Sequence, residues 1–157
     1  NFLKSIGIAN PPGWLLSTKS ALPAVMIVTV WKWAGYYMII FLAGLQGIPK
    51  QLYEASEVDG ASGLTKFFHI TLPLLSPTTF LILILLIINS FQVFDLINIM
   101  TEGGPGRATN VLVYRIYQEG FKYMHFGYAS AEAYFLFAII LIITGIQFWG
   151  QKKWVVY

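Results

Sequence analysis

Residues 79–88 read TFLILILLII, ten consecutive positions without a charged side chain. A helix at the edge of a soluble bundle keeps a polar face along one side, because that side contacts water. This stretch has no such face at any helical spacing. It therefore favours a helix that spans a membrane over a buried helix of a soluble bundle, which is the alternative fold for an apolar run of this kind.

The same stretch forms the centre of one of three long apolar runs. Each run contains a single charged residue, and the runs cover residues 22–45 (with Lys32), 78–97 (with Asp95) and 126–149 (with Glu132). A helix of about 20 residues crosses a hydrocarbon core of about 30 Å. The sequence therefore predicts an all-α integral membrane protein, in which residues 1–157 belong to a single transmembrane domain with three spans.

The composition excludes several other classes of protein. The chain has 157 residues, of which 57% are hydrophobic and 11% charged, whereas soluble domains carry about 25% charged residues. It contains no cysteine, so these residues form no disulfide, thiol nucleophile or thiolate metal site. The net charge of +3 is dispersed, without the basic stripe of a nucleic-acid binder. No metal site is expected either, because neither His69 nor His125 has an acidic residue or histidine four positions away.

The segment between the first two runs, residues 46–71, is the most polar part of the chain. Pro49 can occupy the first position of a helix, and Gly60 can end that helix in a left-handed conformation, which predicts a short helix over about residues 50–59. Ser62 can cap a second short helix. The residues expected on one face of this second helix are Leu64, Phe67, Phe68 and Thr71.

Proline and glycine predict turns at several other places. These turns are at Pro11-Pro12-Gly13 in a loop of residues 1–21, at Pro73 and Pro77 before the second run, and at Gly103-Gly104-Pro105-Gly106. A helix is expected from Thr109 within the loop of residues 98–125. Its aromatic residues, Tyr114, Tyr117, Phe121 and Tyr123, favour a position at the membrane interface.

One segment carries a motif. Residues 52–77 read LYEASEVDGASGLTKFFHITLPLLSP, which resembles the coupling-loop signature of binding-protein-dependent ABC importer permeases, E-A-A-x-x-D-G-A followed by I-x-L-P. The matching residues are Glu54, Ala55, Asp59, Gly60, Ala61, Ile70, Leu72 and Pro73, with Ser56 where the commonest form has alanine. The stretches WKWAGYYMIIFLAGLQGIPKQLYEAS, SFQVFDLINIMTEGGPG and FGYASA are similar to sugar permeases of the maltose and glycerol-phosphate type.

The resemblance implies a type I importer permease fold in a bacterial-type cytoplasmic (inner) membrane. It places residues 46–71 in the cytoplasm as a coupling loop and residues 98–125 on the opposite side, which the lysine and arginine counts alone do not decide. Members of the family have further spans upstream, so the chain is expected to be the C-terminal part of a permease.

The chemistry of the motif suits contact with a soluble ATPase. The candidate coupling residues are Glu54, Ala55, Ser56, Asp59, Gly60 and Ala61. Small side chains allow a partner to approach closely, and Gly60 allows a sharp reversal of the chain. Glu54 can form charge-assisted hydrogen bonds with a basic group. Three apolar residues are expected to root the loop against the spans: Phe67, Phe68 and Leu72. An ordinary polar loop is the alternative, which explains the turns but not the whole pattern.

Polar residues within the spans are candidates for the solute pathway, because such groups are costly in lipid. The candidates are Gly35, Tyr36, Tyr37, Asn89, Ser90, Gln92 and Asp95. Hydroxyl and amide groups beside aromatic faces suit a sugar, and hydrogen bonding between helices is the alternative role. Lys32 is expected either to pair with Asp95 or to extend towards the interface. Glu132 departs from the family pattern, and its role is not predicted.

The function implied by the resemblance is that of a transport subunit without chemistry of its own. The expected partners are a second homologous permease, a dimeric ABC ATPase that uses ATP and Mg²⁺, an extracytoplasmic solute-binding protein, a sugar-like solute and the lipid bilayer. The 157 residues contain no G-x-x-x-x-G-K-[ST] loop, and no cofactor is expected on this chain. The alternatives are a membrane scaffold without transport, an importer of a non-sugar solute and an intramembrane enzyme, for which no nucleophile lies beside Asp95 or Glu132.

Overall fold

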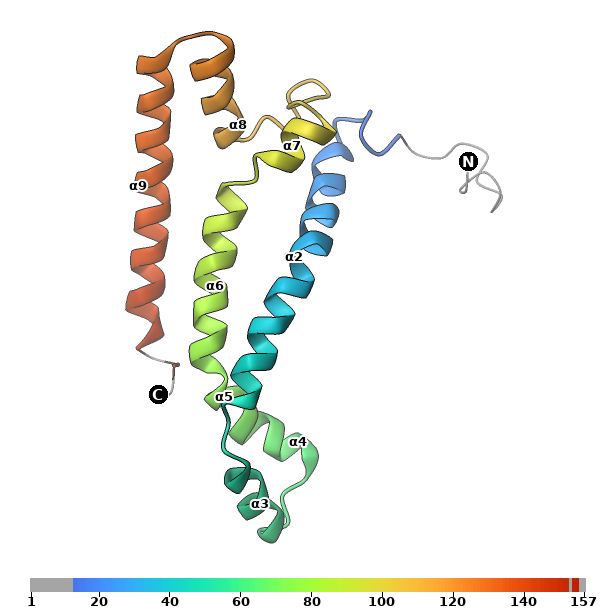
Figure 1. The fold of residues 1–157 in the computed structure, drawn as a ribbon, viewed down its shortest axis with the longest axis vertical. Coiled ribbons are helices and arrows are strands. Elements are labelled where there is room, and N and C mark those ends of the chain that lie inside the picture. Colours follow the sequence, from blue (N-terminus) through green and yellow to red (C-terminus); the bar gives the residue numbers. More distant parts are fainter. Residues whose placement is uncertain (1–12, 153, 156–157) are drawn as a thin grey trace, which may run out of the picture. The chain divides into compact units, whose positions relative to one another are not determined.

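The computed structural model describes residues 13–152, 154 and 155. In this part of the chain all regular structure is helical (Figure 1). Three stretches are long and apolar enough to cross a membrane, namely α2 (Ala21–Gln46), Ser76–Met100 and α9 (Phe126–Gln151). The prediction of an all-α membrane protein with three spans is therefore confirmed. The expected turn at Pro11-Pro12 lies outside the described residues.

The second span is not one continuous helix, as its apolar run suggested. Helix α6 (Ser76–Phe91) ends before Gln92, and the short helix α7 (Asp95–Met100) begins three residues later. Gln92 has φ −109° and ψ 20°, outside the helical region, and its backbone N–H donates to the Asn89 carbonyl in a tighter turn. The break allows the chain to turn at the point where Phe94 and Ile97 enter a separate core.

The chain divides at this break into two compact units. Unit 1 combines the chain up to Lys32 with Val93–Ala133, and unit 2 combines Trp33–Gln92 with the residues from Tyr134 onward. Helices α2 and α9 each contribute to both units. Each unit has its own packing and is described separately.

The core of unit 1 is formed by Val25, Ile97 and Tyr114, each almost fully buried. Tyr114 belongs to α8 (Leu112–Tyr117) and packs against the Gly-Gly-Pro-Gly turn, where a Cβ on Gly103 would lie 2.8 Å from its ring. Within the aromatic segment Tyr114 is 0% exposed and packs in this core; the position of the segment at the membrane interface stays a prediction. Thr109, expected in the helix, lies before it.

Thr109 instead fixes the turn. Its hydroxyl donates to the Gly104 carbonyl at 2.7 Å and lies 2.7 Å from the Thr101 hydroxyl, and the residue is fully buried. After α8 the chain continues as a π-helical turn, η2 (Gln118–Lys122), and folds back towards α9. There the buried Gly120 lies close to Ala129.

Unit 2 contains the loop between the first two spans. Helix α3 (Lys50–Val58) is followed by α4 (Gly63–Lys66), a π-helical turn η1 (Phe67–Thr71) and α5 (Leu72–Leu74). The predicted turns at Pro73 and Pro77 are wrong, because both prolines stand in the first turns of α5 and α6. Proline is tolerated in a first turn such as that of α6, since the N–H that it lacks would have no partner in the helix, whereas Pro73 directly follows the π-helical turn η1.

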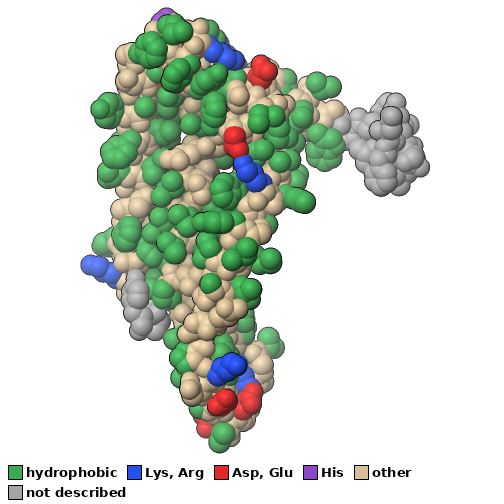
Figure 2. Space-filling view, viewed as in Figure 1, with side chains coloured by type: hydrophobic (Ala, Val, Ile, Leu, Met, Phe, Trp, Pro, Cys, Tyr) green, Lys and Arg blue, Asp and Glu red, His purple; other side chains and the backbone are tan. Residues whose placement is uncertain are grey.

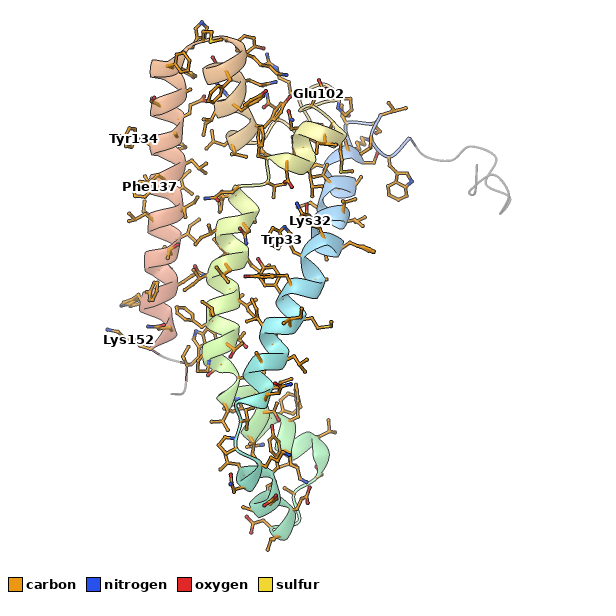
Figure 3. All side chains as sticks on the ribbon, viewed as in Figure 1. Lys32, Trp33, Glu102, Tyr134, Phe137 and Lys152 are labelled. Atoms are coloured by element: carbon orange, nitrogen blue, oxygen red, sulfur yellow. The ribbon has the colours of Figure 1, made fainter. Side chains whose placement is uncertain are left out.

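The spans of unit 2 pack through small and aromatic residues. A Cβ on Gly44 of α2 would lie 2.5 Å from the Thr78 Oγ1 of α6, so glycine allows these two helices to meet closely. Phe80 of α6 packs edge-on against Phe148 of α9, with ring centroids 5.4 Å apart. Elsewhere the helices are covered by exposed apolar side chains (Figure 2), among them Tyr134 and Phe137, which project outward from α9 (Figure 3).

Candidate functional site

The candidate coupling loop is a helical hairpin with its turn at Gly60. Helix α3 ends at Val58. The backbone N–H of the next residue, Asp59, still donates to the Ala55 carbonyl, and Gly60 then adopts φ +73°. The Ser62 hydroxyl accepts from the Thr65 backbone N–H and caps α4. The structure thus confirms the left-handed glycine and the serine cap, both of which were predicted from residue type.

The motif residues lie on the surface of this hairpin. Glu54, Ala55, Asp59 and Gly60 are exposed, while Ser56 and Ala61 are half-buried. The Ala61 backbone N–H donates to the Ser56 carbonyl at 2.9 Å. Figure 2 shows basic and acidic side chains gathered at this end of unit 2. The exposed surface of the hairpin thus combines charged and small side chains.

Two contacts that the motif does not include join the arms of the hairpin. The Lys66 Nζ donates to Glu57 Oε1 at 2.8 Å, and the hydroxyls of Tyr53 and Thr71 lie 2.9 Å apart. The hydrogen bond and charge of Lys66 hold the pKa of the Glu57 carboxyl below its ordinary value of 4.5. Opposite charges on either side of a glycine turn are a signal from which this ion pair could have been predicted.

The apolar residues of the hairpin remain largely exposed. Phe67, Phe68 and Leu72 were expected to root the loop against the spans, but their exposed fractions are 48%, 57% and 46%. The two phenylalanine rings pack edge-on against each other. Val58 and Leu64, near the turn, are 89% and 74% exposed.

In unit 2 the structure separates the predicted pathway residues into packed and exposed groups. Asn89 Nδ2 donates to the Tyr37 hydroxyl at 2.9 Å, so these two residues join α2 to α6. Tyr37 is buried, whereas Tyr36 is half exposed. Gly35, which has nothing within 4 Å of a Cβ position, is also exposed, as are Ser90 and Gln92.

Trp33, which was not among the predicted residues, extends the aromatic group of unit 2. Its ring lies 5.6 Å from the Tyr36 ring and 6.1 Å from the Tyr37 ring, and the two tyrosine rings are 5.3 Å apart. The exposed Ser90 hydroxyl donates to the Ile87 carbonyl of its own helix. Unit 2 thus carries aromatic faces, hydroxyl groups and amides on two adjacent spans.

Unit 1 contains the Lys32–Asp95 pair. The Lys32 Nζ donates to Asp95 Oδ2 in an ion pair, which confirms the suggested pairing of these two span residues. Their side chains remain 43% and 57% exposed. Lys32 lies on α2, immediately before Trp33 (Figure 3).

Glu132 also has a partner that the sequence did not indicate. Its Oε1 lies 2.8 Å from the Nε of Arg115, and its side chain is only 13% exposed. The same guanidinium donates to the Tyr128 hydroxyl at 3.0 Å. Glu132 of α9 therefore holds Arg115 of α8, and this explains why a carboxylate is tolerated in the third span.

A polar cavity of about 290 Å³ lies beside this pair in unit 1. Charged and amide side chains form most of its wall, together with the glycine turn: Glu102, Gly103, Gly104, Arg107, Asn110, Arg115, Gln118, Glu119 and Tyr123. Glu119 also lies 3.1 Å from the His125 Nδ1. The cavity is thus lined by both acidic and basic groups.

The amino-acid sequence matches the model of one known protein family. Residues 2–155 match the model described as "Binding-protein-dependent transport system inner membrane component". The chain belongs to this family. Membership and the three span-length helices confirm the predicted resemblance and the multi-pass location in the inner membrane.

Two curated relatives and one solved structure are similar to almost the whole chain. The sn-glycerol-3-phosphate transport system permease protein UgpA of Brucella abortus is 40% identical over 156 residues, which cover 99% of this chain and 53% of the relative. The arabinooligosaccharides transport system permease protein AraP of Bacillus subtilis is 36% identical over 139 residues, which cover 88% of this chain and 44% of AraP. This chain therefore spans about half the length of these relatives.

The solved structure is that of a bacterial alginate ABC transporter in complex with an alginate pentasaccharide-bound periplasmic protein. It matches with a TM-score of 0.85 and 26% identity, over 98% of this chain and 53% of the matched chain. The fold of this family member is thus that of an importer permease.

Proposed function

We propose that this chain is part of the permease subunit of an ATP-driven importer for a sugar or a related polyol or oligosaccharide. The observation that carries the proposal is the coupling hairpin, a capped pair of short helices that reverse at Gly60 with φ +73° in a member of the inner membrane component family. The relatives named for glycerol phosphate, arabinooligosaccharides and alginate support the class of solute.

The proposed role of residues 46–71 is to contact a cytoplasmic ABC ATPase dimer, which would bind and hydrolyse ATP with Mg²⁺. Glu54 and Asp59 offer exposed carboxylates to basic groups of the ATPase. The small residues Ala55, Ser56 and Ala61 allow the two surfaces to approach closely. The exposed side chains of Val58 and Leu64 would add an apolar contact with the ATPase, and this contact would remove them from water.

The proposed solute pathway uses the exposed polar and aromatic residues of the spans. In unit 2, Tyr36 and Gln92 offer an aromatic face and an amide, which suit sugar rings and hydroxyls. In unit 1, the exposed Asp95 and its partner Lys32 offer charge that lipid would not tolerate. A second homologous permease would cover the exposed faces of the spans.

The loop of residues 98–125 is the proposed docking side for an extracytoplasmic solute-binding protein. The charged cavity in unit 1 offers paired acidic and basic groups to such a partner. The alginate transporter, whose structure includes a periplasmic protein, supports the expectation of such a partner.

Hydrogen exchange on the full-length permease tests the coupling role. We expect the amides of residues 50–66 to exchange more slowly when the ATPase dimer is present, while residues 98–125 are unchanged. Equal exchange in both states across residues 50–66 would contradict the proposal.

A further inference from the structure

The coupling hairpin has no core of its own. No residue of α3, α4 or η1 is buried, and an isolated helix as short as α3 is only marginally stable in water. The first arm, α3 (Lys50–Val58), and the second arm, α4 with η1 (Gly63–Thr71), therefore depend on specific contacts for a fixed mutual position.

Two such contacts lie on one face of the first arm. Tyr53 and Glu57 are four residues apart, so their side chains share a face of α3. Glu57 contacts Lys66 at 2.8 Å, and Tyr53 contacts Thr71 at 2.9 Å. The ion pair joins the arms near the turn, and the hydroxyl pair joins them where the hairpin meets the span.

The position of Thr71 gives the second contact its importance. After Thr71 the chain continues through α5 and a single residue, Leu75, into α6. The first arm is connected to α2 only through the short segment between Gln46 and Lys50. A contact between Tyr53 and Thr71 therefore links α3 directly to the base of the second span.

We propose that the Glu57–Lys66 ion pair and the Tyr53–Thr71 hydrogen bond brace the coupling hairpin into one rigid body, so that displacement of α3 by the ATPase moves α6. Tyr53, Glu57, Lys66 and Thr71 are then positioning residues for coupling, distinct from the motif residues that contact the ATPase. This inference rests on the proposed function of the hairpin.

The first test measures the rigidity of the hairpin in the full-length permease bound to its ATPase. Spin labels on cysteines at Gln51 and Leu64, one exposed residue on each arm, report the distance between the arms by double electron–electron resonance. We expect a single narrow distribution for the otherwise unmodified protein and a broad one for Lys66→Glu. The charge swap Glu57→Lys/Lys66→Glu should restore the narrow distribution.

Lys50→Glu is the matched control, because it makes the same change of charge on an exposed residue of the same hairpin. The ionic strength provides a second readout. Raising the salt concentration shortens the Debye length from about 30 Å at 0.01 M to about 3 Å at 1 M. The higher salt concentration should broaden the distribution of distances between the labels in the unmodified protein. It should have no such effect in Glu57→Gln/Lys66→Met, because this variant has no ion pair to screen.

The second test measures coupling without a transported solute. Labels at Leu42 and Leu81, on α2 and α6 of unit 2, report the movement of the spans when the complex is trapped with ATP, Mg²⁺ and vanadate. Because an exposed ion pair is worth a factor of about two to five in a conformational equilibrium, Lys66→Glu should reduce the ratio of moved to unmoved complexes by about that factor. ATP hydrolysis per complex should stay unchanged.

The hydroxyl pair is tested by a double-mutant cycle. Tyr53→Phe and Thr71→Val should each reduce the fraction of complexes in which the spans have moved. The double variant should reduce this fraction no further than either single variant. Unchanged distances and movement in all the variants would overturn the inference, as would a charge swap that fails to restore them. Failure of the proposed function is distinguishable, because the unmodified permease would then bind no ATPase dimer.

Discussion

The Nε of Arg115 on α8 lies 2.8 Å from the Oε1 of Glu132 on α9, and this ion pair fastens the aromatic segment of unit 1 to the third span. The two residues lie on different helices, with a π-helical turn between them. The second nitrogen of the guanidinium is occupied by the Tyr128 hydroxyl. Glu132 is therefore a structural partner of Arg115.

Removal of the Glu132 carboxylate should loosen unit 1. Glu132→Ala removes the acceptor of the Arg115 guanidinium. Because the Arg115 side chain is 46% exposed, water replaces part of the contact, and the loss should cost up to about 1 kcal/mol. We expect a lower thermal midpoint for the full-length permease in detergent and faster hydrogen exchange in residues 112–122. Ser130→Ala, an exposed change on the same helix, is the control. An equal effect of both variants would show that the ion pair has no special role.

Gly60 provides the sharpest test of the hairpin conformation. Gly60 and Gly63 both have nothing within 4 Å of a Cβ position, but only Gly60 has a positive φ, +73°. A β-branched residue disfavours that conformation by about 1–2 kcal/mol. Gly60→Val should therefore uncouple ATP hydrolysis from transport, whereas Gly63→Val should leave them coupled. Normal transport by the Gly60→Val complex would contradict the assignment of the loop.

The hydrogen bond between Tyr37 and Asn89 should stabilise the packing of α2 against α6. Interhelical hydrogen bonds in membranes contribute about 0.6 kcal/mol on average and up to about 1.7 kcal/mol. Tyr37→Phe should destabilise the permease by an amount in this range. Addition of Asn89→Leu to Tyr37→Phe should cost little more, because the bond is already absent. Independent, additive losses in thermal stability would show that the two residues act separately.

Tyr36 should act on solute specificity instead. Its ring is half exposed beside Tyr37 and Trp33, so its truncation leaves the buried contact in place. We expect Tyr36→Ala to change the concentration dependence of uptake, with assembly with the ATPase unchanged. Met38→Ala, an exposed neighbour on α2, serves as the control. Loss of assembly in Tyr36→Ala would indicate packing against another subunit.

Local features of the loop could be predicted from single residues. Gly60 and Ser62 act through their own backbone and side-chain chemistry, so their types indicated the left-handed turn and the helix cap. The same local rules failed at Pro73 and Pro77, which begin helices here instead of marking turns. Proline excludes a helix interior but not a first turn, and the sequence did not distinguish the two.

Contacts between distant residues were harder to predict. A pairing of Lys32 with Asp95 could be suggested from the sequence, because each residue is the only charge in its span and an isolated charge in lipid is costly. Arg115 lies in a polar loop, where solvent is an adequate partner, so nothing indicated its contact with Glu132. The break between Phe91 and Asp95 was also missed, because the apolar run continues through it and the cause is tertiary packing of Phe94 against Tyr114 and Tyr117.

Native mass spectrometry of the gently solubilised full-length permease identifies the subunits that it binds. We expect a complex in which this permease and a homologous one are bound to an ATPase dimer. A transport-competent assembly of this permease alone, with no ATPase bound, would show that it is not a subunit of an ATP-driven importer.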